Sequence, residues 1–349
     1  MVTSSATAPQ TDVRRPTVPT VPPLRIVFFG TPAFAVPSLD ALLSAAPHMV
    51  VGVVTRPDRP RGRGQKTSDA PVKARALTAG LPLLQPERMK DQAFLDDLAA
   101  WRADLGVVAA YGRILTDAIL AIPRLGMINV HASLLPRYRG AAPVHRAVIA
   151  DEHSTGVTIM RVVKALDAGP MLAKEHRAIG ADETSEEVER DLARIGSRLL
   201  VAVVDQIARG HAREEAQDDT AATYAHRLTK DDGVIDWHWP ALRVHNLIRG
   251  LHPWPHAFSV LHGKRVILRR SAVDTPGPPE PGLHTEAGRV PLDLPGTILE
   301  ADGDRLIVIT GEGRLRIIEI QAEGKRPMSA REFLAGHRLT AGDRFTAAP

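Results

Sequence analysis

An Asn-x-His pair closes one of the apolar runs of this sequence. Residues 127–131 read MINVH, a run typical of a buried strand, and Asn129 and His131 stand at its end. Alternate residues of a strand point to the same side, and the carboxyl end of a strand in an open α/β sheet is the usual place for a ligand. Imidazole exchanges protons near neutral pH, and a carboxamide can donate to a developing oxyanion. The pair is therefore a candidate for group-transfer chemistry.

A carboxylate follows in a loop that contains Gly and Ala. Asp167 lies in the stretch KALDAGPML, residues 164–172. If it lies near His131, it can orient the ring and favour its charged form. Each residue also has an ordinary structural interpretation, as a hydrogen-bonded histidine, a strand-end turn residue for Asn129 and a loop cap for Asp167. The functional interpretation depends on the three residues occurring together.

The stretches around these residues resemble the methionyl-tRNA formyltransferases, within the folate-dependent formyltransferase superfamily. Asn-x-His is followed by Ser-Leu-Leu-Pro and later by Asp-Ala-Gly. The resemblance runs from Leu24 to the end of the chain and includes FFGTPAFAVPSLDALL, VVTRPDRPRGRGQK, APVKARAL, VVAAYGRIL, TKDDGVIDW and IRGLHPWPHAF. It implies transfer of the formyl group of 10-formyltetrahydrofolate to the amino group of methionyl initiator tRNA. It also implies that no metal takes part.

Formyl transfer makes three demands on a site. The oxyanion must be stabilised, the leaving folate nitrogen needs a proton, and the attacking amine must lose one. The resemblance implies that Asn129, His131 and Asp167 are the catalytic residues, and their chemistry suits these demands. Whether His131 acts as a general acid or as an oxyanion donor stays open from the sequence.

The resemblance also implies binding residues. The folate site takes in Ser133, Leu134, Leu135 and Pro136, with Ala109, Ala110, Tyr111 and Gly112 at its border. Phe34 lines the methionine pocket, or it is a core residue. Contacts to tRNA come from a basic loop and from one strand of the second domain, namely Arg56, Arg59, Arg61, Arg63, Lys66, Lys264 and Arg265. Arginine can grip phosphate with two hydrogen bonds, but such residues also occur on ordinary solvated loops and charged barrel faces.

Composition limits the remaining possibilities. The chain has 349 residues, 44% of them apolar, which favours two domains. The absence of cysteine excludes disulfides and thiolate catalysis and fits a reducing cytoplasm. The net charge of +4 permits a polyanionic partner. No apolar run approaches the about 18–20 residues of a membrane span, so we expect a cytoplasmic protein without membrane association, and a monomer.

Strands that alternate with helices predict an α/β catalytic domain over residues 24–208, with a Rossmann-like, mostly parallel sheet. A long helix at 185–208 completes this domain. The predicted strands are 24–29, 49–55, 105–110, 127–131, 156–163 and 171–179, and the shorter helices are 36–45, 71–79 and 92–102.

The rest of the chain divides into three parts. Residues 1–23 are rich in Pro, Thr and Ser and are predicted to be a disordered extension, and the polar stretch 209–223 is predicted to be a linker. Residues 224–349 are predicted to form a β-barrel domain that binds tRNA, with an OB-like fold as one candidate. Its expected elements are a helix at 242–248, strands at 257–261, 265–269, 296–299, 306–309 and 315–320, and a late helix behind a Ser329/Glu332 capping box.

Several other functions remain as alternatives. They are a formyltransferase acting on a nucleotide sugar or a glycinamide, a hydrolase that releases formate from the same carrier, and an RNA-binding protein without catalysis. A Ser133-His131-Asp167 acyl hydrolase and a dinucleotide-dependent dehydrogenase lack their glycine motifs. His252 and His256 have the spacing of metal ligands on a helix, but the prolines between and beside them exclude a regular helix, so we expect packing there.

Overall fold

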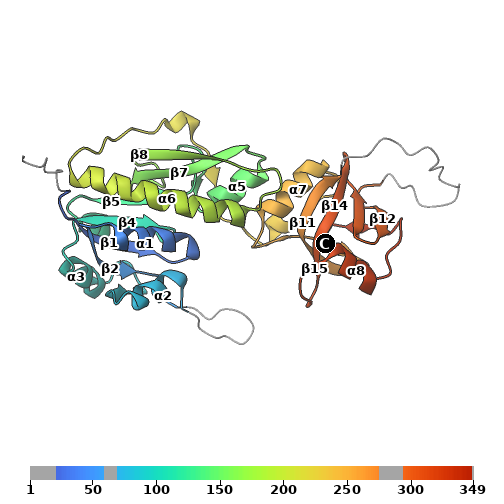
Figure 1. Ribbon diagram of the computed structural model, residues 1–349, viewed down its shortest axis with the longest axis horizontal. Helices are drawn as coiled ribbons and strands as arrows, with labels where there is room; N and C mark the ends of the chain where they lie inside the picture. Colours follow the sequence, from blue (N-terminus) through green and yellow to red (C-terminus); the bar gives the residue numbers. More distant parts are fainter. Residues whose placement is uncertain (1–20, 59–68, 275–293, 348–349) are drawn as a thin grey trace, which may run out of the picture.

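The computed structural model describes residues 21–58, 69–274 and 294–347. Two lobes lie next to each other along the long axis of the molecule (Figure 1). The first lobe contains a mixed sheet flanked by helices, and the second contains a curled antiparallel sheet. Most of the predicted extension lies outside the described residues, and so do Arg59, Arg61, Arg63 and Lys66 of the basic loop.

The first sheet has the order β3-β2-β1-β4-β5-β7-β8. The strands from β3 to β5 are parallel, and β7 and β8 are antiparallel additions at one edge. The sheet is therefore mostly parallel, as predicted. Its strands are β1 Arg25–Gly30, β2 Met49–Val54, β3 Leu83–Leu84, β4 Leu105–Ala109, β5 Met127–His131, β7 Ser154–Arg161 and β8 Met171–Ala178.

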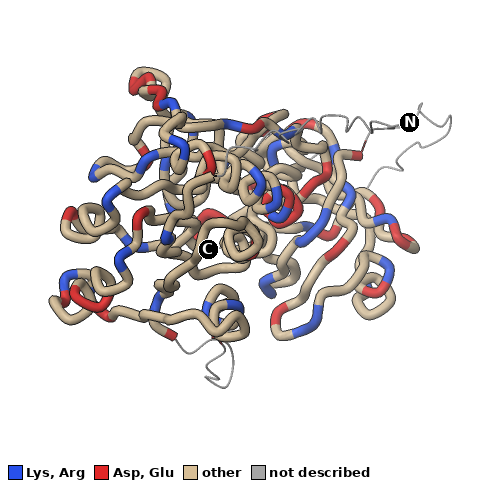
Figure 2. Tube along the Cα trace, turned by 60° about the vertical axis from the view of Figure 1, so that its left-hand side comes forward, with Lys and Arg blue, Asp and Glu red and all other residues tan. Residues whose placement is uncertain are grey.

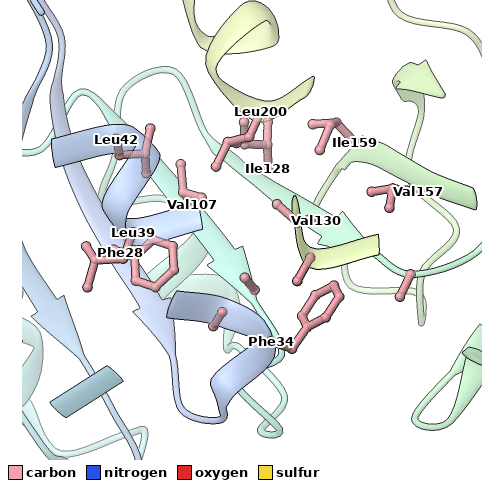
Figure 3. Close-up of a cluster of buried hydrophobic side chains, with 14 of the residues drawn as sticks. Phe28, Phe34, Leu39, Leu42, Val107, Ile128, Val130, Val157, Ile159 and Leu200 are labelled. Carbon is pink, nitrogen blue, oxygen red and sulfur yellow. The ribbon is translucent and has the colours of Figure 1, made fainter. Parts of the chain in front are cut away.

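Helices cover this sheet because its strands are apolar on both faces. On one face α1 (Val36–Ser44) and α6 (Ser185–Ala208) enclose a cluster in which Phe28, Val107 and Ile128 meet Leu39 and Leu200 (Figure 3). A Thr184/Glu187 capping box starts α6 at the predicted residue. The other helices of this lobe are α2 Pro71–Thr78, α3 Gln92–Ala100, α4 Asp117–Leu120 and α5 Pro143–Ile149.

The second sheet has the order β12-β13-β14-β11-β10-β16, with β15 added to β14. Its two ends approach each other through a bridge between Thr297 and Arg344, and Phe345 N donates to Gly296 O at 2.8 Å. The sheet therefore curls around its own apolar core. Its strands are β10 Ala257–Leu261, β11 Lys264–Asp274, β12 Ile298–Asp302, β13 Arg305–Ile309, β14 Arg314–Ala322, β15 Met328–Ser329 and β16 Phe345–Thr346.

Two helices accompany the second sheet. The predicted short helix is α7 (Ala241–Gly250), and the predicted capping box of Ser329 and Glu332 starts α8 (Ala330–Gly336). Helix α7 packs on α5 of the first lobe so closely that a Cβ on Gly250 would lie 2.5 Å from Ile149 Cγ1. Ala142 and Ile149 join the core of the second lobe, so the two lobes share a packed boundary.

Charged residues are mixed over the surface. Figure 2 shows Lys and Arg interspersed with Asp and Glu along the trace of the described residues. Many of these cations are paired, for example Arg177 with Glu183 and Asp191. In the described parts of the chain, no helix has the combination of length and apolar character that crossing a membrane requires.

Candidate active site

The structure brings the predicted histidine and aspartate together. His131 ends β5, and Asp167 lies in the loop between β7 and β8. The distance from His131 Nδ1 to Asp167 Oδ2 is 3.7 Å, with 6% and 16% of the two side chains exposed. Asn129 is half-buried on β5, and strand alternation puts it on the same side as His131. His131 and Asp167 therefore meet at the carboxyl end of β5, with Asn129 on the same side of that strand.

The other ring nitrogen of His131 is held by the backbone. His131 Nε2 lies 3.0 Å from Tyr138 O, and a carbonyl oxygen only accepts, so Nε2 carries a proton. Proton exchange then falls to Nδ1, on the side of Asp167. If Nδ1 is also protonated, the resulting imidazolium has an acceptor on one side and a carboxylate on the other.

Two backbone conformations near His131 are unusual. Asp167 has φ +46° and Tyr138 has φ +59°, in the left-handed region that side chains other than glycine rarely adopt. Gly140 N donates to Asp167 Oδ2 at 2.8 Å. Gly140 itself has φ +118°, and a Cβ there would lie 2.7 Å from Ala225 O. The site is thus made of loops that need outside contacts to keep their shape.

Those contacts come from residues that the sequence did not single out. Arg139 is buried and donates to Gln217 Oε1 and Asp219 Oδ1, at 2.7 Å each from Nη2. Tyr138 N donates to Thr223 Oγ1 at 2.8 Å. The short strands β6 (Arg139–Gly140) and β9 (Tyr224–Ala225) pair in parallel. The segment predicted to be only a linker is therefore in contact with the site.

The predicted folate segment follows His131 directly and closes on β7. Ser133 Oγ donates to Arg137 O at 2.7 Å, and Thr158 Oγ1 donates to Ser133 O at 2.7 Å. Thr158 also accepts from Leu135 N at 3.1 Å. Because the Ser133 hydroxyl is fully buried and donates to a carbonyl oxygen, an acyl-hydrolase role for it is further disfavoured. Leu134 and Pro136 are only partly buried.

The predicted border of the folate site lies where β4 ends. Tyr111 is buried, packs edge-on against Phe29 and donates to Met89 Sδ at 3.4 Å. Burial raises the pKa of Tyr111 to about 12. Its side chain thus anchors the core, and Ala109 is buried as well, whereas Ala110 and Gly112 are exposed. What this segment offers to a ligand is chiefly backbone.

The structure describes Arg56 alone among the predicted cations of the basic loop. A Cβ on Gly112 would lie 3.5 Å from Arg56 Nη1, so this guanidinium reaches the end of β4. Arg56 N donates to Thr31 Oγ1, the residue that follows β1, at 3.4 Å. The cation therefore lies at the same sheet edge as the candidate site.

The other predicted contact residues have different surroundings. Phe34 is 7% exposed and belongs to the same core cluster as Val130 and Val157, which favours its alternative interpretation as a core residue (Figure 3). Lys264 is exposed at the start of β11, whereas the Arg265 guanidinium lies 3.7 Å from the Phe258 ring centre. Of these three, Lys264 keeps a free surface position.

The histidine pair with metal-ligand spacing lies at the boundary of the lobes. His252 Nε2 is 3.2 Å from Glu186 Oε2, and Arg269 donates from Nη1 to His256 Nε2 at 2.9 Å. Burial, and then the charge of Arg269, lowers the pKa of His256 to about 4. In the described ranges, no three His, Asp or Glu side chains gather as a metal site would require.

Comparison with known proteins identifies the family. Residues 24–204 match the formyl transferase family, and residues 227–338 match the formyl transferase C-terminal domain. The methionyl-tRNA formyltransferase of Moorella thermoacetica is 44% identical over 92% of this chain and 98% of that protein. The enzyme of the same name from Caldanaerobacter subterraneus subsp. tengcongensis is 45% identical over 91% of this chain and 99% of that protein.

Solved structures share the fold at lower identity. The sugar 3N-formyl transferase WlaRD, solved in the presence of dTDP and 5-N-formyl-THF, is 16% identical with a TM-score of 0.60. The match covers 87% of this chain and 99% of that one. With the folding pattern and two family matches in agreement, and with relatives of one name matching nearly the whole chain, this protein is a member of the methionyl-tRNA formyltransferase family.

Proposed function

We propose that this chain transfers the formyl group of 10-formyltetrahydrofolate to the free amino group of methionyl initiator tRNA, in support of translation initiation. The observation that carries the proposal is the His131–Asp167 pair beside Asn129, at the strand edge of a formyl transferase domain. A sugar acceptor is disfavoured because the sugar enzyme WlaRD is 16% identical, against 44% for the Moorella methionyl-tRNA enzyme.

The reaction forms a bond between the amine nitrogen and the formyl carbon and breaks the bond from that carbon to the folate nitrogen. The amine loses a proton and the folate nitrogen gains one. We assign this transfer to His131 Nδ1, because Nε2 is bound to Tyr138 O and Nδ1 faces Asp167. Asn129 donates its amide to the oxyanion that develops as the carbon becomes tetrahedral. Asp167 orients His131 and stabilises its charged form.

The substrate contacts are part of the same proposal. Folate binds against the segments after β4 and β5, which end at one sheet edge, and no metal is needed. The acceptor strand of the tRNA meets cations. The folate residues are Ser133, Leu134, Leu135, Pro136, Ala109, Ala110, Tyr111 and Gly112, and the cations are Arg56, Arg59, Arg61, Arg63, Lys66, Lys264 and Arg265.

The domain plan follows. Residues 24–208 carry catalysis, 209–223 are the linker, and 224–349 bind tRNA through an OB-like barrel, which the approach of Thr297 to Arg344 supports. We propose that the enzyme acts as a monomer in the cytoplasm, where its proposed acceptor is used.

The test is formyl transfer from 10-formyltetrahydrofolate to charged initiator tRNA, with charged elongator tRNA and free methionine as controls. We expect transfer confined to initiator tRNA. Formate release without transfer would favour the hydrolase alternative, and transfer to a sugar nucleotide but not to tRNA would favour the sugar-modifying relatives. If charged tRNA binds but no turnover occurs, the chain is an RNA-binding protein.

A further inference from the structure

The polar segment after α6 returns along the catalytic lobe. Figure 1 shows it, in yellow, passing from the far end of α6 beside β8 towards the second lobe. Glu215 and Met171 exchange two backbone hydrogen bonds of 2.8 Å, which fix the segment to the start of β8. Its course brings Gln217 against the loop that carries Asp167.

Gln217 uses every hydrogen-bonding position of its amide. Nε2 donates to Asp167 O at 2.9 Å and to Gly169 O at 2.7 Å. Oε1 accepts from Arg139 Nη2 at 2.7 Å and from Nε at 3.1 Å. One side chain therefore joins the loop of Asp167 to the segment that follows Tyr138, whose carbonyl binds His131.

The Asp167 loop has little freedom of its own. Asp167 is left-handed, and a Cβ on Gly169 would lie 1.9 Å from Arg161 O. A non-glycine residue in this region costs about 1–3 kcal/mol and persists only where its surroundings impose it. The two donor hydrogens of Gln217 act on carbonyls at and just beyond the strained residue. They are thus placed to impose its conformation.

The same arrangement fixes the partner of the other ring nitrogen. Arg139, which Gln217 accepts from, lies between Tyr138 and Gly140. Tyr138 O binds His131 Nε2, and Gly140 N binds the Asp167 carboxylate. Displacing Gln217 would therefore shift the groups on both sides of the imidazole together.

We propose that Gln217 is a positioning residue for formyl transfer, which holds Asp167 and the Tyr138–Gly140 segment in place on the two sides of the His131 ring. This inference rests on the proposed function for its reaction but concerns a residue outside the assigned catalytic and binding sets. In this role Gln217 takes up no proton and needs no contact with substrate. Its effect is to keep Asp167 Oδ2 and Tyr138 O at their places beside the ring.

Two variants distinguish the effect of the Gln217 amide donors from that of its acceptor oxygen. Gln217→Leu removes both, whereas Gln217→Glu keeps the size and the contact with Arg139 but cannot donate to the two carbonyls. We expect kcat to fall about 10- to 100-fold in both variants, because small displacements of catalytic groups have costs of this size. KM for folate and for charged tRNA should stay within about threefold.

The matched control is Glu214→Gln in the same linker. It weakens a 2.7 Å ion pair to Arg161 at a side chain 44% exposed, and Glu214 does not bind the Asp167 loop. We expect wild-type kcat and an unchanged melting temperature. Wild-type kcat in Gln217→Leu would overturn the proposal, and so would a loss in Gln217→Leu that Gln217→Glu fully restores, since the donors would then be irrelevant.

A readout without turnover keeps this test separate from the assigned reaction. NMR titration of the His131 ring in the substrate-free protein should change in Gln217→Leu and Gln217→Glu and stay unchanged in Glu214→Gln. An unchanged His131 titration in both Gln217 variants would overturn the inference even if activity fell. If the wild-type protein does not transfer formyl groups but the titration shifts as expected, the proposed function fails and the positioning role stands.

Discussion

Two groups of histidines in this molecule have different surroundings. His131 lies between a carbonyl and the Asp167 carboxylate, whereas His256 accepts a hydrogen bond from a guanidinium. At the boundary of the lobes, burial lowers the pKa of His245 and His252 as well. The charge of Arg269 lowers the pKa of His252 and of His256 further. A nearby carboxylate does not by itself distinguish the candidate catalytic histidine, because His252 lies 3.2 Å from Glu186 and His245 lies 3.4 Å from Asp182.

The position in the fold explains the difference. His131 ends a parallel strand, where loops from several strands meet at one open edge. The boundary histidines lie between α6, α7 and β11, among arginines that bind carbonyl and carboxylate oxygens of the other lobe. Polar side chains at the edge of a sheet stay available to a ligand, whereas those at the contact between the lobes are already paired with other protein groups.

The largest effect should come from breaking the first group. His131→Ala and Asp167→Asn should each lower kcat about 10²- to 10⁴-fold, the usual contribution of general acid–base catalysis, while folate binding and folding persist. Steady-state formyl transfer and folate titration would measure this. His256→Gln is the control and should keep kcat within about twofold. Full activity in either of the first two variants would remove the assigned roles.

The next effect should come from breaking the second group. Arg249 is 4% exposed and donates to Asn246 Oδ1 at 2.7 Å, to Gly180 O at 3.2 Å and to Glu183 O at 3.1 Å. Arg249→Met removes the donor to Asn246 Oδ1 and to Glu183 O, while Gly180 O keeps only its bond from Glu183 N, and this should lower the free energy of unfolding by about 2–4 kcal/mol. Urea denaturation measures this.

Activity in the folded fraction of Arg249→Met should be retained. The exposed pair of Arg305 with Glu300 provides the comparison, and Arg305→Ala should leave the urea midpoint unchanged. Equal loss of stability in both variants would mean that the buried hydrogen bonds of Arg249 stabilise the fold no more than the exposed Arg305–Glu300 pair does.

The smallest effect concerns pH. Burial lowers the pKa of His145 and of His256 from 6.5 to about 4, with further lowering by Arg146 and by Arg269 respectively. Below pH 6.5 these two histidines bind protons in the unfolded chain, whereas in the folded protein they stay neutral until the pH approaches 4. The stability from the neutral rings is therefore complete above pH 6.5 and is lost as the pH falls towards 4.

The capping carboxylate of Glu187 acts in a lower range. Hydrogen bonds from Thr184, and then the contact with Arg270, lower the pKa of Glu187 to about 2, so its contribution is lost only below its unfolded value of 4.5. Between pH 6.5 and 4.5 the urea midpoint should decline in the wild type and decline less in His256→Gln. Parallel curves for the two proteins would contradict the assignment.

Much of the fold could be predicted from the sequence because it rests on periodicity. The limits of α6 and of β5 and the capping box of α8 follow from local patterns. Short elements such as β3 and α5 were missed, because a few residues carry no usable period. Strand β11 is longer than expected, continuing to Asp274, since half-buried positions at its end obscure the pattern.

The candidate site was predictable only in part. The meeting of His131 with Asp167 was predicted from strand-end position and family motifs. Gln217 and Thr223 could not be found in this way, because a polar side chain that binds a backbone carbonyl or a backbone N–H leaves no pattern in the sequence. Arg265 shows the converse, since a basic residue on a strand can stack on an aromatic ring of its own domain.

The pairing of β6 with β9 has a consequence for the making of this protein. The N-terminal residues leave the ribosome first, so the sheet and α6 can assemble while Thr223 and Ala225 are still in the exit tunnel. Until those residues emerge, Tyr138 N and Arg139 N have no partners, and the surroundings of His131 are incomplete. The candidate site is thus completed late in translation, after the segment that leads into the second lobe has been synthesised.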